Sequence, residues 1–354
     1  MLKENIKNRC IIRQYGEKYK VVYSYDTGYY YLIPEKNFNL ENYKEDGLYK
    51  LSYSDFNKCV KSAVNPAGIS LNDIPSPVVM GIMFSNTCNL KCNYCIAAHA
   101  HSYSTKNILK DKYVELHKKI QDSQVVGIII SGGEPTMNAS LREFLQLISS
   151  EIYLCELDTN GTNISDELIV DLKRLFVIPR VSLDSIYEEI HNLVRGRFKE
   201  TMNTIKCMID EEIEFRINTV LHEKNKKNIY DLGNWIYKNR INKWHIYKLQ
   251  KRYADISLWV SDEEMINIVG NLKREFEKEI IILCKHRKKE DNFASFMIDS
   301  EGICFSTQNG EKVIFGNIFS SSINEIWDNT SEEFKRNHLK KFFYYEEKKS
   351  YEKI

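Results

Sequence analysis

Three cysteines, Cys88, Cys92 and Cys95, stand within one short segment of the chain. Each could bind one iron of a cubane iron–sulfur cluster as a thiolate. The fourth iron would then lack a nearby protein ligand, and chemistry at a metal requires such an open coordination position. The spacing therefore predicts a [4Fe-4S] cluster with one iron available for chemistry.

A structural zinc ion, or a set of packed thiols, is the alternative interpretation of these cysteines. Zinc sites usually take four ligands from two paired motifs, and no second Cys-x-x-Cys or histidine pair follows downstream. His99 and His101 could supply a fourth ligand, but we expect them on the loop after the cysteines. The pattern favours the cluster.

The cysteines follow directly on an apolar run, residues 78–84, which we predict to be a buried β-strand. Beyond it, short apolar runs alternate with amphipathic helical stretches, so that six strands are each followed by a helix. This alternation predicts an α/β fold with a parallel sheet, in the form of a partial (β/α)6 barrel whose site lies at the C-terminal ends of the strands. The other predicted strands are residues 125–131, 152–158, 178–183, 214–221 and 244–250.

Small and polar residues stand where these strands end. Glycines at 132 and 133 would let the backbone approach a ligand closely, and a Gly-Gly or Asn-Gly pair is also an ordinary turn. An arginine after a strand could equally form a surface ion pair, and a strand asparagine could satisfy a local backbone group. The candidates, in chain order, are Gly132, Gly133, Glu134, Pro135, Asn160, Ser182, Asp184, Arg195 and Asn218.

The spacing Cys-x3-Cys-x2-Cys, with Tyr94 before the last cysteine, resembles the signature of the radical S-adenosylmethionine (SAM) superfamily. The resemblance extends from about Val78 to Gln250, because further motifs of the family follow in order. It implies that SAM chelates the open iron and is cleaved by one-electron reduction to methionine and a 5'-deoxyadenosyl radical, which abstracts a substrate hydrogen. It also implies flavodoxin or ferredoxin as the electron donor.

The resemblance assigns roles to the candidate residues, and Tyr94 joins them as a cofactor-binding residue. Gly132, Gly133, Glu134 and Pro135 match a Gly-Gly-Glu-Pro motif that meets the methionine ammonium of SAM. Segments like those around Asn160, Ser182 and Asp184 line the ribose and carboxylate. Arg195 resembles an arginine that reaches the SAM carboxylate, and Asn218 lies in a strand that borders the adenine in relatives.

Two further regions flank this core, which we place at residues 78–250. Residues 1–75 are expected to form a small β-rich domain, separated by a linker rich in proline and glycine. This unit resembles the front domains of peptide-modifying radical SAM maturases, which hold a precursor peptide as an added strand at a sheet edge. Its tyrosines could contact such a peptide or fill a small core.

Residues 251–354 begin with a helix and resemble the SPASM or twitch-type ending of such maturases. A full SPASM region carries about seven cysteines for auxiliary clusters, whereas this one offers only Cys284 and Cys304, so an auxiliary cluster is doubtful. The tail from Ser331 onward is expected to be a solvated helix with a frayed end.

The overall charge gives little reason to expect a nucleic-acid or membrane partner, because 50 basic and 49 acidic residues leave a net charge of +1. The N-terminus shows no signal-like apolar run, so we expect a cytoplasmic protein with reduced cysteines.

The leading hypothesis is an enzyme that matures a ribosomally synthesised peptide. A small-molecule enzyme such as a viperin-like nucleotide dehydratase, and a non-catalytic cluster-binding sensor, are the alternatives.

Overall fold

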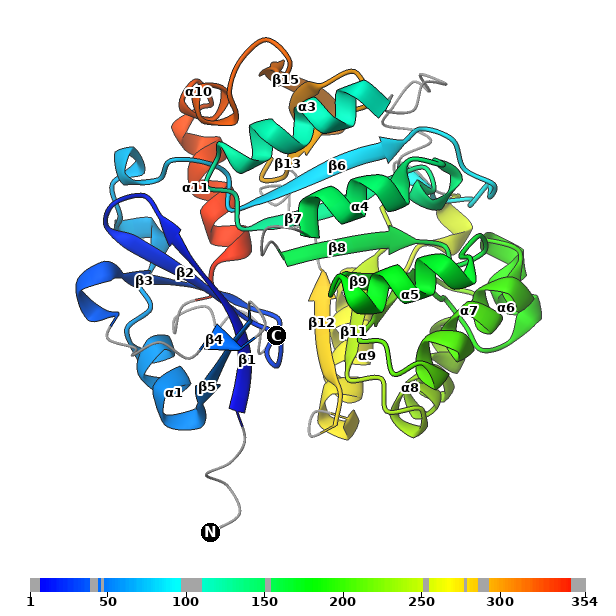
Figure 1. The fold of residues 1–354 in the computed structure, drawn as a ribbon. Helices are drawn as coiled ribbons and strands as arrows, with labels where there is room; N and C mark the ends of the chain where they lie inside the picture. Colours follow the sequence, from blue (N-terminus) through cyan, green and yellow to red (C-terminus); the bar gives the residue numbers. More distant parts are fainter. Residues whose placement is uncertain are drawn as a thin grey trace.

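The computed structural model of the protein describes residues 7–38, 44–45, 48–96, 110–149, 154–250, 255–276, 279–285 and 293–344. In these parts the chain forms two sheets, a five-stranded antiparallel sheet near the N-terminus and a ten-stranded sheet (Figure 1). No helix of the described residues is both long and apolar enough to cross a bilayer. His99 and His101, the possible zinc ligands, lie outside the described residues.

The N-terminal sheet has the strand order β3-β2-β1-β5-β4 and packs against α1. Its tyrosines alternate between two cores: Tyr23, Tyr25 and Tyr30 join the main core of the molecule, whereas Tyr31 packs with Phe56 of α1. These side chains therefore fill cores rather than an exposed contact surface. The elements are β1 (Lys7–Tyr15), β2 (Tyr19–Ser24), β3 (Tyr30–Pro34), β4 (Lys44–Glu45), β5 (Leu48–Ser52) and α1 (Tyr53–Lys61).

The outer edge of β3 is occupied by other parts of the chain. The backbone N–H of Tyr344 donates to the carbonyl of Tyr30 at 2.7 Å, and that of Val64 donates to the carbonyl of Leu32 at 2.9 Å. Phe343 forms a parallel bridge with Tyr30 at the same place. A peptide that added as a strand here would have to displace the chain's own residues 343–344.

The large sheet has the strand order β12-β11-β10-β9-β8-β7-β6-β13-β14-β15, and the strands from β12 to β13 are parallel. The parallel strands are almost continuously buried, as expected where both faces of a sheet are covered. This is the predicted partial barrel of β6 to β11, extended by β12 on one side and by β13, β14 and β15 on the other. Its strands are β6 (Val79–Ser85), β7 (Gly127–Gly132), β8 (Leu154–Thr159), β9 (Ile178–Ser182), β10 (Arg216–Leu221), β11 (Lys243–Lys248) and β12 (Ile281–Lys285).

The connecting helices follow the strands and cover one side of the sheet (Figure 1). α5 begins after the N-cap Ser165, whose hydroxyl accepts a hydrogen bond from the N–H of Leu168. These helices are α3 (Lys110–Gln121), α4 (Leu141–Ser149), α5 (Asp166–Arg174), α6 (Glu188–Val194), α7 (Phe198–Asp210), α8 (Ile229–Lys238) and α9 (Asp262–Phe276).

The C-terminal region continues the large sheet beside β6. It adds β13 (Phe296–Ile298), β14 (Ile303–Gln308), β15 (Glu311–Asn317), α10 (Ile323–Asp328) and α11 (Glu332–Phe342). The expectation that the tail is a solvated helix is wrong for α11, because Phe334, His338 and Leu339 are buried against the core.

Cys304 is buried in β14, and Cys284 is half-buried in β12. The division into domains at residues 75 and 250 stays a prediction.

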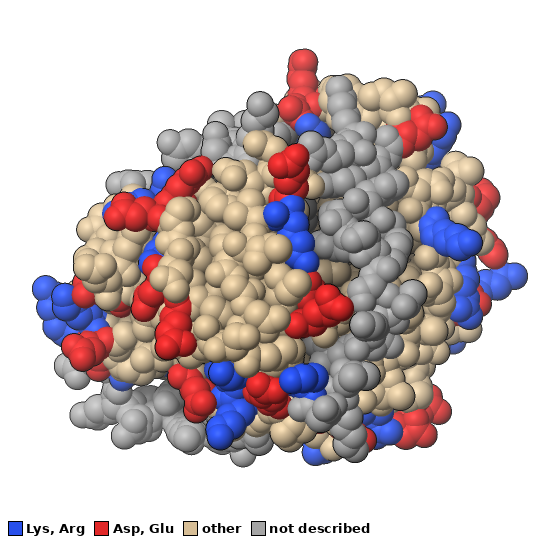
Figure 2. All heavy atoms as spheres, turned by 90° about the horizontal axis from the view of Figure 1, so that it is seen from above, with Lys and Arg blue, Asp and Glu red and all other residues tan. Residues whose placement is uncertain are grey.

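Charged side chains of both signs are scattered over the face of the molecule that is seen from above (Figure 2). Neither sign dominates that face, which agrees with the near balance of acidic and basic residues in the sequence.

Candidate functional site

The three cysteines lie on the loop that leaves the C-terminal end of β6. Cys88 is exposed, and Cys92 and Cys95 are half-buried. The thiols are near enough to interact: the pKa of Cys92 is raised to about 11, mainly by burial and also by the charges of Cys95 and Cys88, while Arg195 opposes the shift. Bringing three thiolates together at neutral pH thus requires a positively charged centre that binds them.

N–H groups face two of the sulfur atoms. The backbone N–H of Leu90 lies 3.4 Å from the sulfur of Cys88, and the side-chain amide of Asn160 lies 3.9 Å from it. The Arg195 guanidinium points Nη1 at the sulfur of Cys92, 4.0 Å away. Donors directed at ligand sulfurs are the surroundings that suit iron–sulfur thiolates.

No three His, Cys, Asp or Glu side chains among the described residues converge closely enough to bind a single metal ion. A mononuclear site such as zinc requires all its ligands to meet one atom. In a cubane cluster each thiolate binds a different iron, so the thiols stand further apart. The donor set of three cysteines, with no carboxylate among them, therefore fits a [4Fe-4S] cluster better than an ion.

The Gly132-Gly133 pair packs the end of β7 against the segment that leads into the cysteine loop. A Cβ on Gly132 would lie 2.1 Å from the carbonyl oxygen of Ser85, and one on Gly133 would lie 2.3 Å from that of Thr87. The N–H of Gly133 donates to Ser85 at 2.6 Å, and the N–H of Glu134 donates to Thr87 at 2.7 Å. The glycines are therefore needed for contact between two backbone segments, a reason that the sequence did not reveal.

Glu134 connects the end of β7 to the end of β8. Its buried carboxylate accepts hydrogen bonds from the hydroxyl of Thr159 at 2.8 Å and from the backbone N–H of Asn160 at 2.7 Å, and Thr136 donates two more. Burial raises the pKa of Glu134, and these hydrogen bonds oppose the shift. Among the ion pairs of the described residues none involves Glu134, so an ammonium group would suit this buried carboxylate.

Asn160 is tied in turn to the cysteine loop. Its side-chain amide donates to the side-chain oxygen of Asn89 at 2.9 Å, and the Asn89 side-chain amide donates to the hydroxyl of Thr162 at 2.7 Å. Asn89 stands one residue after Cys88, so the end of β8 holds the start of the loop. The sequence motifs did not single out Asn89, because an asparagine between two cysteines has no recognisable partner until the fold is known.

Asp184, Arg195 and Tyr94 form a second buried group beside Cys92. The Nε of Arg195 donates to Asp184 at 2.8 Å, the Tyr94 hydroxyl donates to the same carboxylate, and the guanidinium lies 5.3 Å from the centre of the Tyr94 ring. Burial opposes ionisation of Asp184, but Arg195 and the neighbouring histidines His222 and His191 hold its pKa below the ordinary value. Arg195 is therefore held by a buried carboxylate, and the alternative that it forms a surface ion pair is wrong.

Ser182, Asn218 and His245 stand in register on three adjacent strands. Asn218 is buried, and its side-chain oxygen has no hydrogen-bond partner among the described residues. A buried acceptor without a donor suits a ligand that brings one. Only the strand register places His245 beside Asn218, so spacing along the chain does not group it with Ser182 and Asn218.

A network of buried charges crosses two of these strands, β9 and β10, and the neighbouring β8. Glu156 pairs with Arg180 at 2.9 Å and with Arg216 at 2.8 Å, and Arg180 also contacts Asp158 at 2.6 Å. The two arginines hold the pKa of Glu156 below its ordinary value, although burial opposes this. Such charges are retained in a fold only when they are paired, so this network fixes the strands that carry Ser182 and Asn218.

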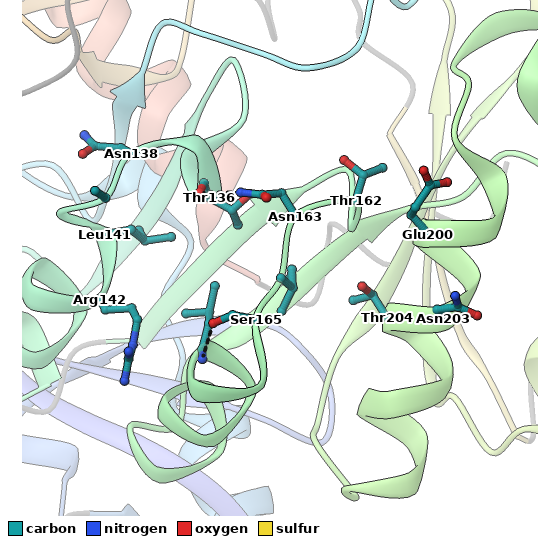
Figure 3. A pocket seen from close by; sticks show the side chains of 13 residues that line it. Thr136, Asn138, Leu141, Arg142, Thr162, Asn163, Ser165, Glu200, Asn203 and Thr204 are labelled. Atoms are coloured by element: carbon teal, nitrogen blue, oxygen red, sulfur yellow. Dashed lines mark hydrogen bonds between the residues drawn. The ribbon is translucent and has the colours of Figure 1, made fainter.

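A separate groove of about 520 Å³ opens between the loops after β7 and β8 and the start of α7 (Figure 3). It shares Thr136 and Thr162 with the hydrogen bonds around Glu134 and Asn160, but no cysteine lines it. Arg142 at its border is paired with Asp171. We place the site at the cysteine loop and not in this groove, because no cysteine that could bind an iron–sulfur cluster lines the groove.

Comparison with known proteins supports the same location. Residues 82–236 match the Radical SAM superfamily. The chain is 31% identical to the antilisterial bacteriocin subtilosin biosynthesis protein AlbA of Bacillus subtilis over 171 residues, which make up 46% of this chain and 37% of AlbA. It is also 26% identical to an AdoMet-dependent heme synthase of Oleidesulfovibrio alaskensis over 287 residues, covering 69% of this chain and 72% of that protein.

The fold resembles that of SuiB from Streptococcus suis, solved with the precursor peptide SuiA. The TM-score is 0.71 at 14% identity, over 93% of this chain and 89% of SuiB, so the likeness concerns the fold. The chain spans less than two fifths of the length of AlbA. The family match covers the cysteine loop and the strand ends that hold it, so residues 82–236 are similar to a superfamily whose cofactors are a [4Fe-4S] cluster and SAM.

Proposed function

We propose that Cys88, Cys92 and Cys95 hold a [4Fe-4S] cluster at which this chain cleaves SAM, and that its substrate is a ribosomally synthesised precursor peptide. The observation that carries the first part is the set of N–H donors aimed at the ligand sulfurs from Leu90, Asn160 and Arg195. When bound, the cluster and SAM supply a 5'-deoxyadenosyl radical that removes a substrate hydrogen.

The protein's own residues bind and orient SAM in this proposal. Glu134 offers a buried carboxylate to the ammonium, beside the backbone of Gly132, Gly133 and Pro135. Asn160, Ser182 and Asp184 border the ribose and carboxylate, and Arg195 and Tyr94 stand next to Cys92. Asn218 offers its free side-chain oxygen to a donor such as the adenine amino group.

The first test is formation of 5'-deoxyadenosine by anaerobically reconstituted protein with SAM and dithionite. We expect the Cys92→Ala variant to lose both the cluster absorbance and the product. Cys207→Ala is the matched control, because Cys207 is half-buried on α7 and lies outside the motif. Equal product from Cys92→Ala and wild type would refute the assignment of the ligands.

The peptide substrate is supported by the biosynthesis protein AlbA among the relatives and by the likeness to SuiB in both sheets. Incubation with small peptides encoded beside the gene should produce a mass change that depends on SAM. Flavodoxin or ferredoxin should replace dithionite as the electron source. No mass change in any such peptide, with SAM still cleaved, would contradict this part of the proposal.

A small-molecule substrate is the second candidate, and the relative named as a heme synthase favours it because the match covers over two thirds of both chains. Nucleoside triphosphates and porphyrins should then stimulate SAM cleavage in the same assay, whereas under the peptide proposal they should not.

A further inference from the structure

The side chain of Arg195 occupies a fixed position beside one cluster ligand. Arg195 follows the last residue of α6, and its side chain is only 11% exposed. Its Nε donates to Asp184 at 2.8 Å, and its Nη1 lies 4.0 Å from the sulfur of Cys92. The face of the guanidinium rests against the Tyr94 ring. One cation is therefore held against one of the three thiolates.

Asp184 is as firmly placed as Arg195. Its side chain is fully buried, one oxygen accepts the backbone N–H of Val220 at 2.9 Å, and the other accepts from Arg195 and Tyr94. The side-chain amide of Asn225 also donates to its backbone carbonyl at 2.9 Å. The guanidinium thus contacts both the Asp184 carboxylate and the Cys92 sulfur, so one buried cation and one buried anion act on this thiol with opposite sign.

Charges in this arrangement act on the energy of adding an electron to the cluster. Reduction from [4Fe-4S]²⁺ to [4Fe-4S]⁺ adds one electron from an external reductant, and no protein bond forms or breaks. A nearby cation stabilises the reduced form, and a nearby anion destabilises it. Both groups are buried, so bulk water screens them little.

We propose that the Arg195–Asp184 pair sets the reduction potential of the cluster: Arg195 raises the potential through Cys92, and Asp184 lowers it and keeps the guanidinium in place. Both residues are positioning residues in this role. The inference rests on the proposed function only in that it needs the three cysteines to hold a cluster.

The test is a redox titration with dithionite and mediators, in which the EPR signal of the reduced cluster is followed without SAM or substrate. Arg195→Gln leaves the buried carboxylate beside Cys92 and should move the midpoint to a more negative potential. Asp184→Asn leaves the guanidinium unopposed and should move it to a more positive one. A tenfold change in the ratio of reduced to oxidised cluster corresponds to about 59 mV for one electron, and we expect each shift to be about this size.

Three further variants separate charge from loss of structure. The double variant should return towards the wild-type midpoint, because both charges are gone. Arg195→Lys keeps the charge and should keep most of the potential. Arg197→Gln removes an exposed arginine that pairs with Glu200 and should change nothing.

Iron content and the absorbance spectrum are measured for every variant. Shifts of opposite sign in cluster-loaded variants support the proposal. Equal midpoints, or two shifts of the same sign, overturn it while the proposed function stands. If Arg195→Gln binds no iron, the sign of the Asp184→Asn shift and the midpoint of Arg195→Lys decide the matter. Failure of the wild type to bind a cluster defeats the proposed function instead.

Discussion

At the scale of single residues, the cysteine loop depends on a backbone contact that any side chain would block. Gly133→Ala places a Cβ 2.3 Å from the carbonyl oxygen of Thr87, which is backbone and cannot rotate away. We expect the loop to shift, the bound iron to fall by at least half, and stability to drop by about 1–3 kcal/mol. Iron analysis and thermal unfolding measure the two effects.

The control for this substitution is Gly68→Ala, because a Cβ on Gly68 meets no atom within 4 Å. It should leave iron content unchanged and stability within about 0.5 kcal/mol of the wild type. Full iron loading in Gly133→Ala would show that the loop tolerates the added carbon.

Spacing along the chain predicts a set of site residues but not how they contact one another. The cysteines, Glu134 and Asn160 follow strand ends, and a parallel sheet brings such ends together. The pairing of Arg195 with Asp184, and the role of Asn89, depend on side-chain directions across loops. The mutual pairing of Glu156, Arg180 and Arg216 likewise depends on which strands are neighbours in the sheet.

At the scale of elements, hydrophobic periodicity predicted the six core strands to within a few residues. It missed α6, a helix of seven residues with a polar sequence, and β12, whose short apolar run could have belonged to either kind of element. It also misjudged α11, because three apolar or neutral side chains among many charges do not show that a helix is buried.

α11 is attached to the core through His338, which is fully buried. Its Nε2 accepts the N–H of Val78 at 3.0 Å, and its Nδ1, as the N–H tautomer, donates to the carbonyl of Ala294 at 2.8 Å. Burial lowers the pKa of His338 to about 3. In the unfolded chain it should titrate near the ordinary value of about 6.5.

The unfolded state therefore binds a proton that the folded state does not, and stability should fall as the pH drops below about 6.5 towards 3. Between pH 7 and pH 5 this single group should cost about 2 kcal/mol. His338→Leu should remove that pH dependence, although it leaves a buried N–H and a buried carbonyl unpaired at about 1–3 kcal/mol each. Anaerobic urea unfolding of both proteins at the two pH values measures the difference. An equal loss of stability between pH 7 and pH 5 in the wild type and in His338→Leu would contradict the assignment of this pH dependence to His338.

At the scale of the whole molecule, the two sheets meet through an ion triad. Glu214, just before β10, accepts Arg9 of β1 at 2.6 Å and Lys243 of β11 at 2.8 Å. Lys243 is almost fully buried, whereas the Arg9 side chain is 40% exposed. Removing the shared carboxylate of Glu214 would leave the buried ammonium group of Lys243 without its partner. Removing Arg9 would leave Glu214 still paired with Lys243.

We therefore expect unequal effects from the two sides of this contact. Glu214→Ala should destabilise the protein by about 3 kcal/mol, because a buried charge loses its partner. Arg9→Ala should cost at most about 1 kcal/mol, as exposed pairs do. Chemical denaturation of both variants measures this, and equal losses would show that Lys243 does not depend on Glu214.

The hydrogen bond between Tyr344 and Tyr30, together with those of Trp327 to Ile74 and of His338 to Val78, has a consequence for synthesis. Each joins the last part of the chain to its first quarter. A nascent chain can form the strands of the barrel in order, but it cannot close the edge of β3 or anchor the linker before β6 until residues 327–344 have been synthesised. These closures therefore come late in synthesis. Until then the tyrosine-rich edge of β3 is open, and a chaperone or a second nascent chain could pair with it.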